Sequence, residues 1–254
     1  MKRRYAACAP FAGKMPALRE KKMEIPNELK PFVKPAWRPV VADGDGSAVA
    51  SKFAGAPFLR PDEEHPVCPN CGRPLQFFLQ LDLAELPDEL GDEFGAGLVQ
   101  LFYCIGEDPC CEVDCEAFFP FAKSVVARLV APEELVEPFK TSPVESAFPP
   151  KRIVGWTRFD DYPSPDEAMD QGVELDDEVL DLIGPHSRDK LAGWPMWSQG
   201  VEYPSCPDCG AAMRLVFQLD SDDHLPFMYG DYGCAHLTQC PAHKDRLAFA
   251  WACS

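Results

Sequence analysis

Residues 66–72 read Pro66-Val67-Cys68-Pro69-Asn70-Cys71-Gly72, and residues 204–210 read Pro204-Ser205-Cys206-Pro207-Asp208-Cys209-Gly210. The likeness extends outward without a gap, from Lys-Phe-Ala-Gly-Ala-Pro at 52–57 and Lys-Leu-Ala-Gly-Trp-Pro at 190–195 to Gln-Leu-Asp at 80–82 and 218–220. Of the 31 positions from 52 to 82, thirteen are identical to the residue 138 positions later. This repetition predicts an internal duplication, in which each copy provides a comparison for the other.

The composition favours a folded protein built from short strands and loops. The chain has 254 residues, 46% of them hydrophobic, which is enough for a substantial core. Its 27 prolines argue against long helical bundles. The net charge of −17 argues against nucleic acid as a partner, because phosphate binding needs a basic face. It favours a basic protein as partner, or alternatively serves solubility alone.

The pattern along the chain divides it into an arm and one domain. Residues 1–24 are expected to form a basic, weakly ordered arm, and residues 25–254 a single domain. The domain contains two repeats, 51–130 and 188–254, joined by a Pro-rich and helical connection at 131–187. No signal core or apolar stretch of membrane-spanning length is seen, so the sequence predicts a cytoplasmic protein with no membrane partner.

Alternating apolar residues predict an α+β fold made mainly of antiparallel sheet. The expected strands lie at 76–83, 98–104, 124–130, 153–159, 214–220 and 247–253. Ser164-Pro165-Asp166-Glu167 is typical of a helix start, and a second short helix is expected at 174–183. The paired Gln80 and Gln218 are interpreted as strand residues that hydrogen-bond a neighbouring loop.

Each Cys-x-x-Cys-Gly motif has the pattern of a zinc knuckle, in which two thiolates reach one ion from a tight turn that glycine permits. The repeat then locates a third ligand in each copy. Six residues separate Gly97 from Cys104 and Gly233 from Cys240, so the two cysteines are equivalent. In the second copy Cys240-Pro-Ala-His243 supplies a fourth, which predicts a site of Cys206, Cys209, Cys240 and His243.

The first copy leaves its fourth ligand open. Cys68, Cys71 and Cys104 are joined by Cys111, or alternatively by Cys110 or Cys115. Vicinal cysteines seldom both bind one ion, so one of Cys110 and Cys111 is expected to be a spectator. Two structural zinc ions are therefore predicted in the chain, although six clustered sulfurs at the first site could instead hold two metals.

The Cys-Pro-x-Cys motifs and the remaining histidines favour structural roles over catalytic ones. Both Cys-Pro-x-Cys motifs lead directly into a strand, whereas a redox site of that kind should open a helix. His65 is paired with Tyr203 in the repeat and is interpreted as an aromatic packing residue, and His224 as part of an exposed acidic loop. Common catalytic motifs are absent from the sequence, and both predicted metal sites are closed to water.

Two family resemblances follow from these motifs. Lys52-Phe-Ala-Gly-Ala-Pro, Gln80-Leu-Asp, Gly97-Leu-Val-Gln-Leu-Phe-Tyr, Asp189-Lys-Leu-Ala-Gly-Trp-Pro and Gly230-Asp-Tyr-Gly resemble the YwqG-like family of bacterial proteins of unknown function. That resemblance covers about 50–254, places the chain in a cysteine-rich branch of the family and implies a duplicated α+β fold. Weaker similarity of Cys68 through Cys110 to the eukaryotic programmed cell death protein 2 family implies a chaperone for a basic ribosomal protein.

The leading functional hypothesis is a non-enzymatic, zinc-stabilised protein-binding module, such as a chaperone or neutralising partner of a basic protein. One alternative is an enzyme of hydrolase type that uses a pocket between the repeats, with Asp82 and Asp220 as candidate acids. Another alternative is a structural scaffold without a specific partner.

Overall fold

The computed structural model describes residues 29–177 and 187–253, together with the single positions 25, 27, 179 and 183. The predicted basic arm at 1–24 lies outside these residues, as does part of the helix predicted for 174–183. The described chain is mostly antiparallel β-sheet with few helices, in agreement with the predicted class.

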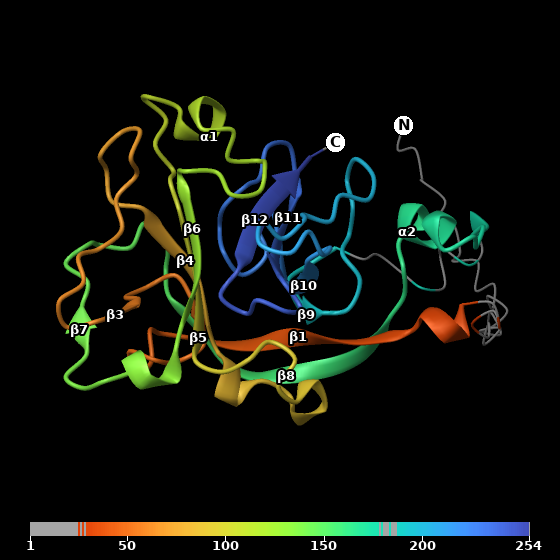
Figure 1. Cartoon of the computed structure of the whole chain (residues 1–254), viewed down its shortest axis with the longest axis horizontal. Coiled ribbons are helices and arrows are strands. Elements are labelled where there is room, and N and C mark those ends of the chain that lie inside the picture. The colour runs from red at the N-terminus through yellow and green to blue at the C-terminus, as the bar shows by residue number, and fades with distance from the viewer. Residues whose placement is uncertain are drawn as a thin grey trace, which may run out of the picture.

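Two long strands form the centre of the sheet. They are β1 (Lys34–Asp43) and β8 (Lys151–Asp161), which pair antiparallel and run side by side across the molecule (Figure 1). No sequence pattern predicts β1, since Pro35 and Pro39 lack the N–H that a central strand normally donates. The sheet accommodates both prolines because its next strand pairs only with Ala36 and Trp37 of β1.

Four shorter strands continue the sheet on each side of this central pair. Beyond β8 lie β2 (Lys52–Phe53), β4 (Gln76–Asp82), β5 (Leu98–Tyr103) and β6 (Val125–Val130). Beyond β1 lie β9 (Lys190–Ala192), β10 (Arg214–Asp220), β11 (Cys234–Gln239) and β12 (Leu247–Ala252). The strand order, β12-β11-β10-β9-β1-β8-β2-β4-β5-β6, therefore reads outward from the centre in the same way in both directions.

Residues 138 positions apart make matching contacts in the two halves. The β4–β5 register is interrupted between Phe77 and Leu79, and the β10–β11 register between Leu215 and Phe217. As predicted, both glutamines bond to loops. Gln80 Nε2 donates to the carbonyls of Ala48 and Ala50, both at 2.9 Å, and Gln218 Oε1 accepts the N–H of Met196 at 2.8 Å.

A buried lysine on β2 and another on β9 anchor these strands to the centre. Lys52 Nζ lies 2.6 Å from Asp45 Oδ1, and Lys190 Nζ lies 2.7 Å from Asp161 Oδ2. The same two aspartates accept the N–H of Ala56 and of Trp194, at 2.8 and 2.7 Å. Each carboxylate thus ties a lysine and a following loop to the sheet.

Short elements complete the fold. Ser164 caps α2 (Pro165–Asp170) by accepting the Glu167 N–H at 3.4 Å, as the helix-start pattern predicts. A two-stranded sheet of β3 (Phe58–Leu59) and β7 (Lys140–Thr141) lies beside the first half. The others are the helix α1 (Cys111–Asp114) and the 3₁₀ turns η1 (Lys30–Phe32), η2 (Leu83–Glu85), η3 (Asp88–Leu90) and η4 (Pro132–Glu134).

The main hydrophobic cluster contains residues from both halves. Phe53 and Phe217 pack edge to face with ring centroids 5.8 Å apart, and Phe78 packs on Phe227 at 5.0 Å. The sheet curls around this cluster until its edge strands β6 and β12 approach each other, which gives a nearly closed, barrel-like shape. No helix within the described ranges combines the length and the hydropathy needed to cross a bilayer.

Candidate metal centres

The first cysteine cluster joins a turn, a strand end and a short helix. Cys68 and Cys71 lie in the turn closed by the bridge between Val67 and Pro74, before β4. Cys104 follows the last residue of β5, and Cys111 begins α1. The sulfurs of Cys68 and Cys111 lie 3.7 Å apart, as do those of Cys71 and Cys104. All four sulfurs fall within 4.8 Å of one another, so one ion can contact them all.

The structure distinguishes the three cysteines between which the spacing left the fourth position open. Cys111 is buried with its sulfur in the cluster, whereas Cys110 is exposed. Cys115 is buried in the same apolar patch but does not belong to the four-sulfur group. The geometry therefore favours Cys111 among the three predicted alternatives.

The second cluster has the same construction with one imidazole. Cys206 and Cys209 lie in the turn before β10, and Cys240 follows β11. His243 Nδ1 lies 3.7 Å from Cys206 Sγ and 3.8 Å from Cys240 Sγ, while the sulfurs of Cys209 and Cys240 are 3.6 Å apart. These four donor atoms also lie within 4.8 Å of one another.

Glycine shapes the backbone of both turns, and backbone N–H groups lower the pKa of one thiol in each cluster. Gly72 and Gly210 have left-handed φ values of 69° and 72°, which a side chain would strain, and each donates its N–H to the carbonyl of the first cysteine at 2.8 Å. The N–H of Arg73 lowers the pKa of Cys71 to about 7. Burial opposes ionisation of Cys240, but the N–H groups of His243 and Ala242 lower its pKa to about 6.

Residues 51–249 match a family model described as Domain of unknown function (DUF1963). The chain belongs to the DUF1963 family. A comparison with curated proteins finds no match. Both cysteine clusters lie inside the DUF1963 domain, since their members run from Cys68 to His243.

The donor sets of this DUF1963 domain suit a tetrahedral ion. Four sulfurs, or three sulfurs and one imidazole nitrogen, are the ligand sets typical of structural zinc. The alternative of two metals in the first cluster would need more sulfurs than the four that converge there. Both clusters can therefore hold a metal ion, and each offers four donor atoms for it.

His65 and His224, to which the sequence assigns no catalytic or metal-binding role, both contact specific neighbouring residues. His65 is in neither donor set, and its ring packs edge-on to Phe102 at 5.6 Å, in line with its predicted packing role. The exposed loop predicted for His224 is wrong, because its side chain is only 13% exposed and stacks on Phe53. Its Nδ1 lies 2.9 Å from Asp189 Oδ2, and Asp223 completes a third group of titratable side chains.

The polar groups of this third group are largely used within the fold. The carboxylate of Asp189 accepts the N–H of Asp220 at 2.7 Å and that of His224 at 3.3 Å. Asp223 accepts the N–H of Asp189 at 2.8 Å. This arrangement fastens the loop after β10 to the strand β9 and is explained without a metal.

The two candidate catalytic acids occupy equivalent strand ends. Asp82 accepts the N–H of Ala84 at 3.0 Å and thereby caps η2. Asp220 accepts the N–H groups of Arg188 at 2.6 Å and Ser221 at 3.1 Å. Both carboxylates are therefore bonded to backbone in the DUF1963 domain.

The sequence patterns miss one feature of the second half, an aromatic cavity beside β12. Its walls include Trp197, Tyr203 and Trp251, with His236 on β11. These residues come from separate segments of the chain and form no motif. The signal that could have found them is the difference from the first copy, where Gln100 and Arg128 take the register positions of His236 and Ala250.

Proposed function

We propose that the chain is a non-enzymatic, zinc-stabilised protein-binding module whose partner is a basic protein. The observation that carries the proposal is the pair of four-donor sets at matching places in the two halves. In each, the protein supplies all four ligands, which leaves no open position at which a metal could activate water. Sites closed in this way are typical of structural zinc.

The metals would stabilise the parts of the sheet that short strands hold weakly. Each cluster ties the turn before β4 or β10 to the end of β5 or β11. A bound ion therefore crosslinks two neighbouring strands outside the main hydrophobic cluster, where burial of apolar surface contributes less.

We further infer that the two halves arose by internal duplication and that the DUF1963 family and the YwqG-like proteins are the same group. The strand order and the matching lysine–aspartate pairs support the first inference. Each half would then carry one zinc knuckle.

The expected partner follows from charge. The chain has 41 acidic against 24 basic side chains, a balance that attracts a basic surface and disfavours nucleic acid. The weaker resemblance to the programmed cell death protein 2 family supports a chaperone role of this kind. None of the eleven cysteines in the described ranges forms a disulfide, which suits a cytoplasmic protein.

The metal part of the proposal is tested by metal analysis and chelation. Purified protein should contain two zinc ions per chain. Removal of the zinc by a strong chelator should lower the melting temperature markedly, and adding zinc back should restore it. Metal-free protein that melts at the original temperature would contradict the structural role.

The partner is tested by co-purification from the native host at low and high salt. A stoichiometric basic protein that is released by salt would support the proposal, since screening weakens contacts between exposed charges. A monomer that turns over a substrate in a library would favour the enzyme alternative, and a chain that recovers no specific partner would favour the scaffold.

A further inference from the structure

The aromatic cavity of the second half has a volume of about 350 Å³ and opens beside β12. Three segments enclose it: the loop 197–204, the strands β11 and β12, and the turn 118–120. The N–H of Trp251 donates to the carbonyl of Phe118 at 3.2 Å, which holds that turn against the strand. The cavity is thus formed by elements that are tied together.

Its walls are aromatic rings in two edge-to-face pairs. Trp197 and Tyr203 meet at 79° with centroids 5.0 Å apart, and Phe118 and Trp251 at 82° and 5.9 Å. All four of these aromatic residues line the enclosed space. A ring face carries negative partial charge, which attracts a cation enclosed between such faces.

Carboxylates behind the walls fix both indoles. Trp197 Nε1 donates to Glu167 Oε2 at 2.7 Å, and the Tyr203 hydroxyl donates to the same oxygen at 3.1 Å. Trp251 Nε1 donates to the Tyr103 hydroxyl at 3.0 Å, which donates in turn to Glu112. Rings held in this way need little reordering when a ligand binds.

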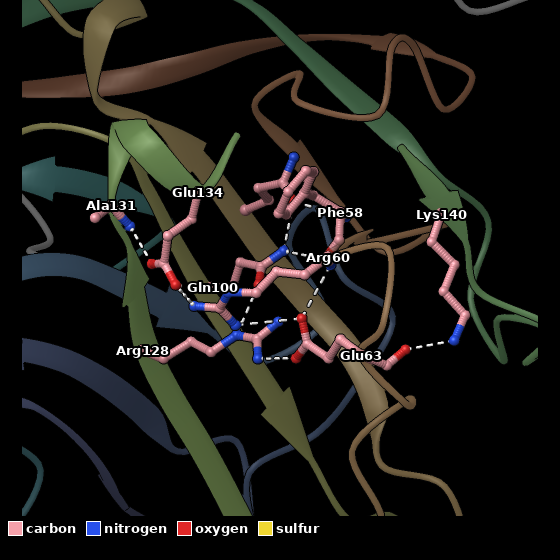
Figure 2. Close-up of polar contacts among 9 residues, drawn as sticks. Phe58, Arg60, Glu63, Gln100, Arg128, Ala131, Glu134 and Lys140 are labelled. Carbon is pink, nitrogen blue, oxygen red and sulfur yellow. Dashed lines mark hydrogen bonds and ion pairs between the residues drawn. The ribbon is translucent and has the colours of Figure 1, made fainter. Parts of the chain in front are cut away.

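The equivalent place in the first half is filled from within. Gln100 lies opposite Arg128 in the β5–β6 register, as His236 lies opposite Ala250 in the β11–β12 register. Figure 2 shows the Arg128 guanidinium in a network with the Gln100 amide and the Glu63 carboxylate. The first half therefore places its own cation, Arg128, where the second half has the short side chain of Ala250.

The charges around the cavity favour a positive ligand. Glu202 lines the cavity and is exposed, and Glu167 lies behind its rings. His236 stays neutral, because burial lowers its pKa to about 3. The nearby cation Lys190 is paired with Asp161.

We propose that this cavity binds an alkylated ammonium cation, held by the faces of Trp197, Tyr203 and Trp251 and by the charge of Glu202. Alkyl groups would fill the aromatic space, and the positive charge would match the carboxylates around it. The cation can come from a free small molecule or from a trimethylated lysine side chain. The proposal is independent of the zinc sites and of any basic partner.

The test is a titration of the full, metal-loaded chain with choline and with its neutral carbon analogue 3,3-dimethylbutan-1-ol, followed by tryptophan fluorescence and calorimetry. Choline should bind saturably and about tenfold more tightly than the alcohol, since only choline gains the cation–π attraction. A peptide with trimethyllysine forms the second arm, and tighter binding than choline would identify a lysine side chain as the source.

Matched variants locate the site. Glu202→Gln should weaken choline binding severalfold, whereas Glu64→Gln, the corresponding position of the first half, should leave it unchanged. Ala250→Arg, which introduces the residue of the first half, should abolish binding, and Trp197→Leu serves if that variant fails to fold. Equal affinity for choline and the alcohol, equal effects of the two glutamine variants, or no saturable binding would overturn the proposal.

Discussion

Cys110 and Cys111 are adjacent in the chain and have different surroundings. Cys110 is exposed, whereas Cys111 begins α1 and places its sulfur 3.7 Å from that of Cys68. Spacing alone cannot separate the two, because the choice depends on where a four-residue helix begins. The structure makes this choice testable with a pair of neighbouring substitutions.

Cys111→Ser should remove one metal ion, because three sulfurs remain for a site that needs four ligands. We expect zinc content to fall from two ions per chain to one and the melting temperature to fall by more than about 5 °C. Cys110→Ser is the control and should retain both ions and the original melting temperature. Metal analysis and thermal unfolding measure both effects, and a loss of zinc from the control instead would assign the ligand to Cys110.

His236 gives the fold a defined sensitivity to acid. Its pKa is about 3 in the folded chain, chiefly because it is buried, against an ordinary value of 6.5. Between these values the unfolded chain takes up a proton that the folded chain does not, so stability falls as the pH falls from about 6.5 toward 3.

His236→Gln, which introduces the residue of the first half, should remove this contribution. Between pH 7 and pH 5 the variant should lose about 1–2 kcal/mol less stability than the natural chain, measured by urea unfolding at both values. Protonation of the zinc ligands affects both proteins alike. Identical pH dependence in the two proteins would show that the folded chain protonates His236 as readily as the unfolded chain does, which contradicts the lowered pKa.

At the scale of elements, the two buried lysines differ in how fully their partners are shielded. The side chain of Asp161 is 4% exposed and that of Asp45 is 36% exposed, while both lysines are almost fully buried. A charge left without its partner in the interior costs more than one that water can reach.

Lys190→Met should therefore destabilise the fold by about 3–5 kcal/mol, because it removes the buried ammonium that lies 2.7 Å from Asp161 Oδ2. Lys52→Met should cost clearly less. The double variant Lys190→Met/Asp161→Asn should recover part of the loss, although Asp161 also accepts the Trp194 N–H. Chemical unfolding of the three variants measures these differences, and equal losses for the two single variants would argue against shielding as the cause.

The strands that alternate apolar and polar residues are predictable, and the centre of the sheet is not. Gln76–Asp82 and Arg214–Asp220 follow directly from their patterns, and the loop contacts of their glutamines were expected. The strand β1 could not be predicted, because Pro35 and Pro39 are typical of a loop. Only the structure shows that β9 is short and pairs with Ala36 and Trp37 alone. Whether a proline excludes a strand therefore depends on how far the neighbouring strand extends.

At the scale of the whole molecule, the two candidate metal centres lie outside one hydrophobic cluster that both halves share. That cluster includes Phe78 and Tyr103 from the first half and Phe217 and Phe249 from the second. Loss of the metal from either centre should therefore lower the stability of the entire sheet, since neither half buries its apolar face alone.

Cys206→Ser should accordingly unfold in a single calorimetric transition at a lower temperature than the natural chain. Two separate transitions, with only one shifted, would show that the halves unfold independently. The Cys110→Ser variant again provides the control, since it changes an exposed thiol and neither donor set.

The candidate metal centres could be predicted because each begins with a short-range motif, whereas the aromatic cavity could not. Six of the eight donors come from the Cys-x-x-Cys turns and the cysteines that follow β5 and β11. The cavity depends on side chains from three distant segments and on the replacement of Arg128 by Ala250 at one register position. Such a difference becomes visible only when both halves are placed on the same sheet.

The central pairing of β1 with β8 has a consequence for the order of folding. It joins Lys34 to Asp161, so a long loop must close before the middle of the sheet exists, and long-range pairing of this kind is slow. The first four-sulfur cluster needs only the segment from Cys68 to Cys111. A metal ion bound at this cluster would therefore link the turn before β4 to the end of β5 during synthesis, while β8 is still unmade.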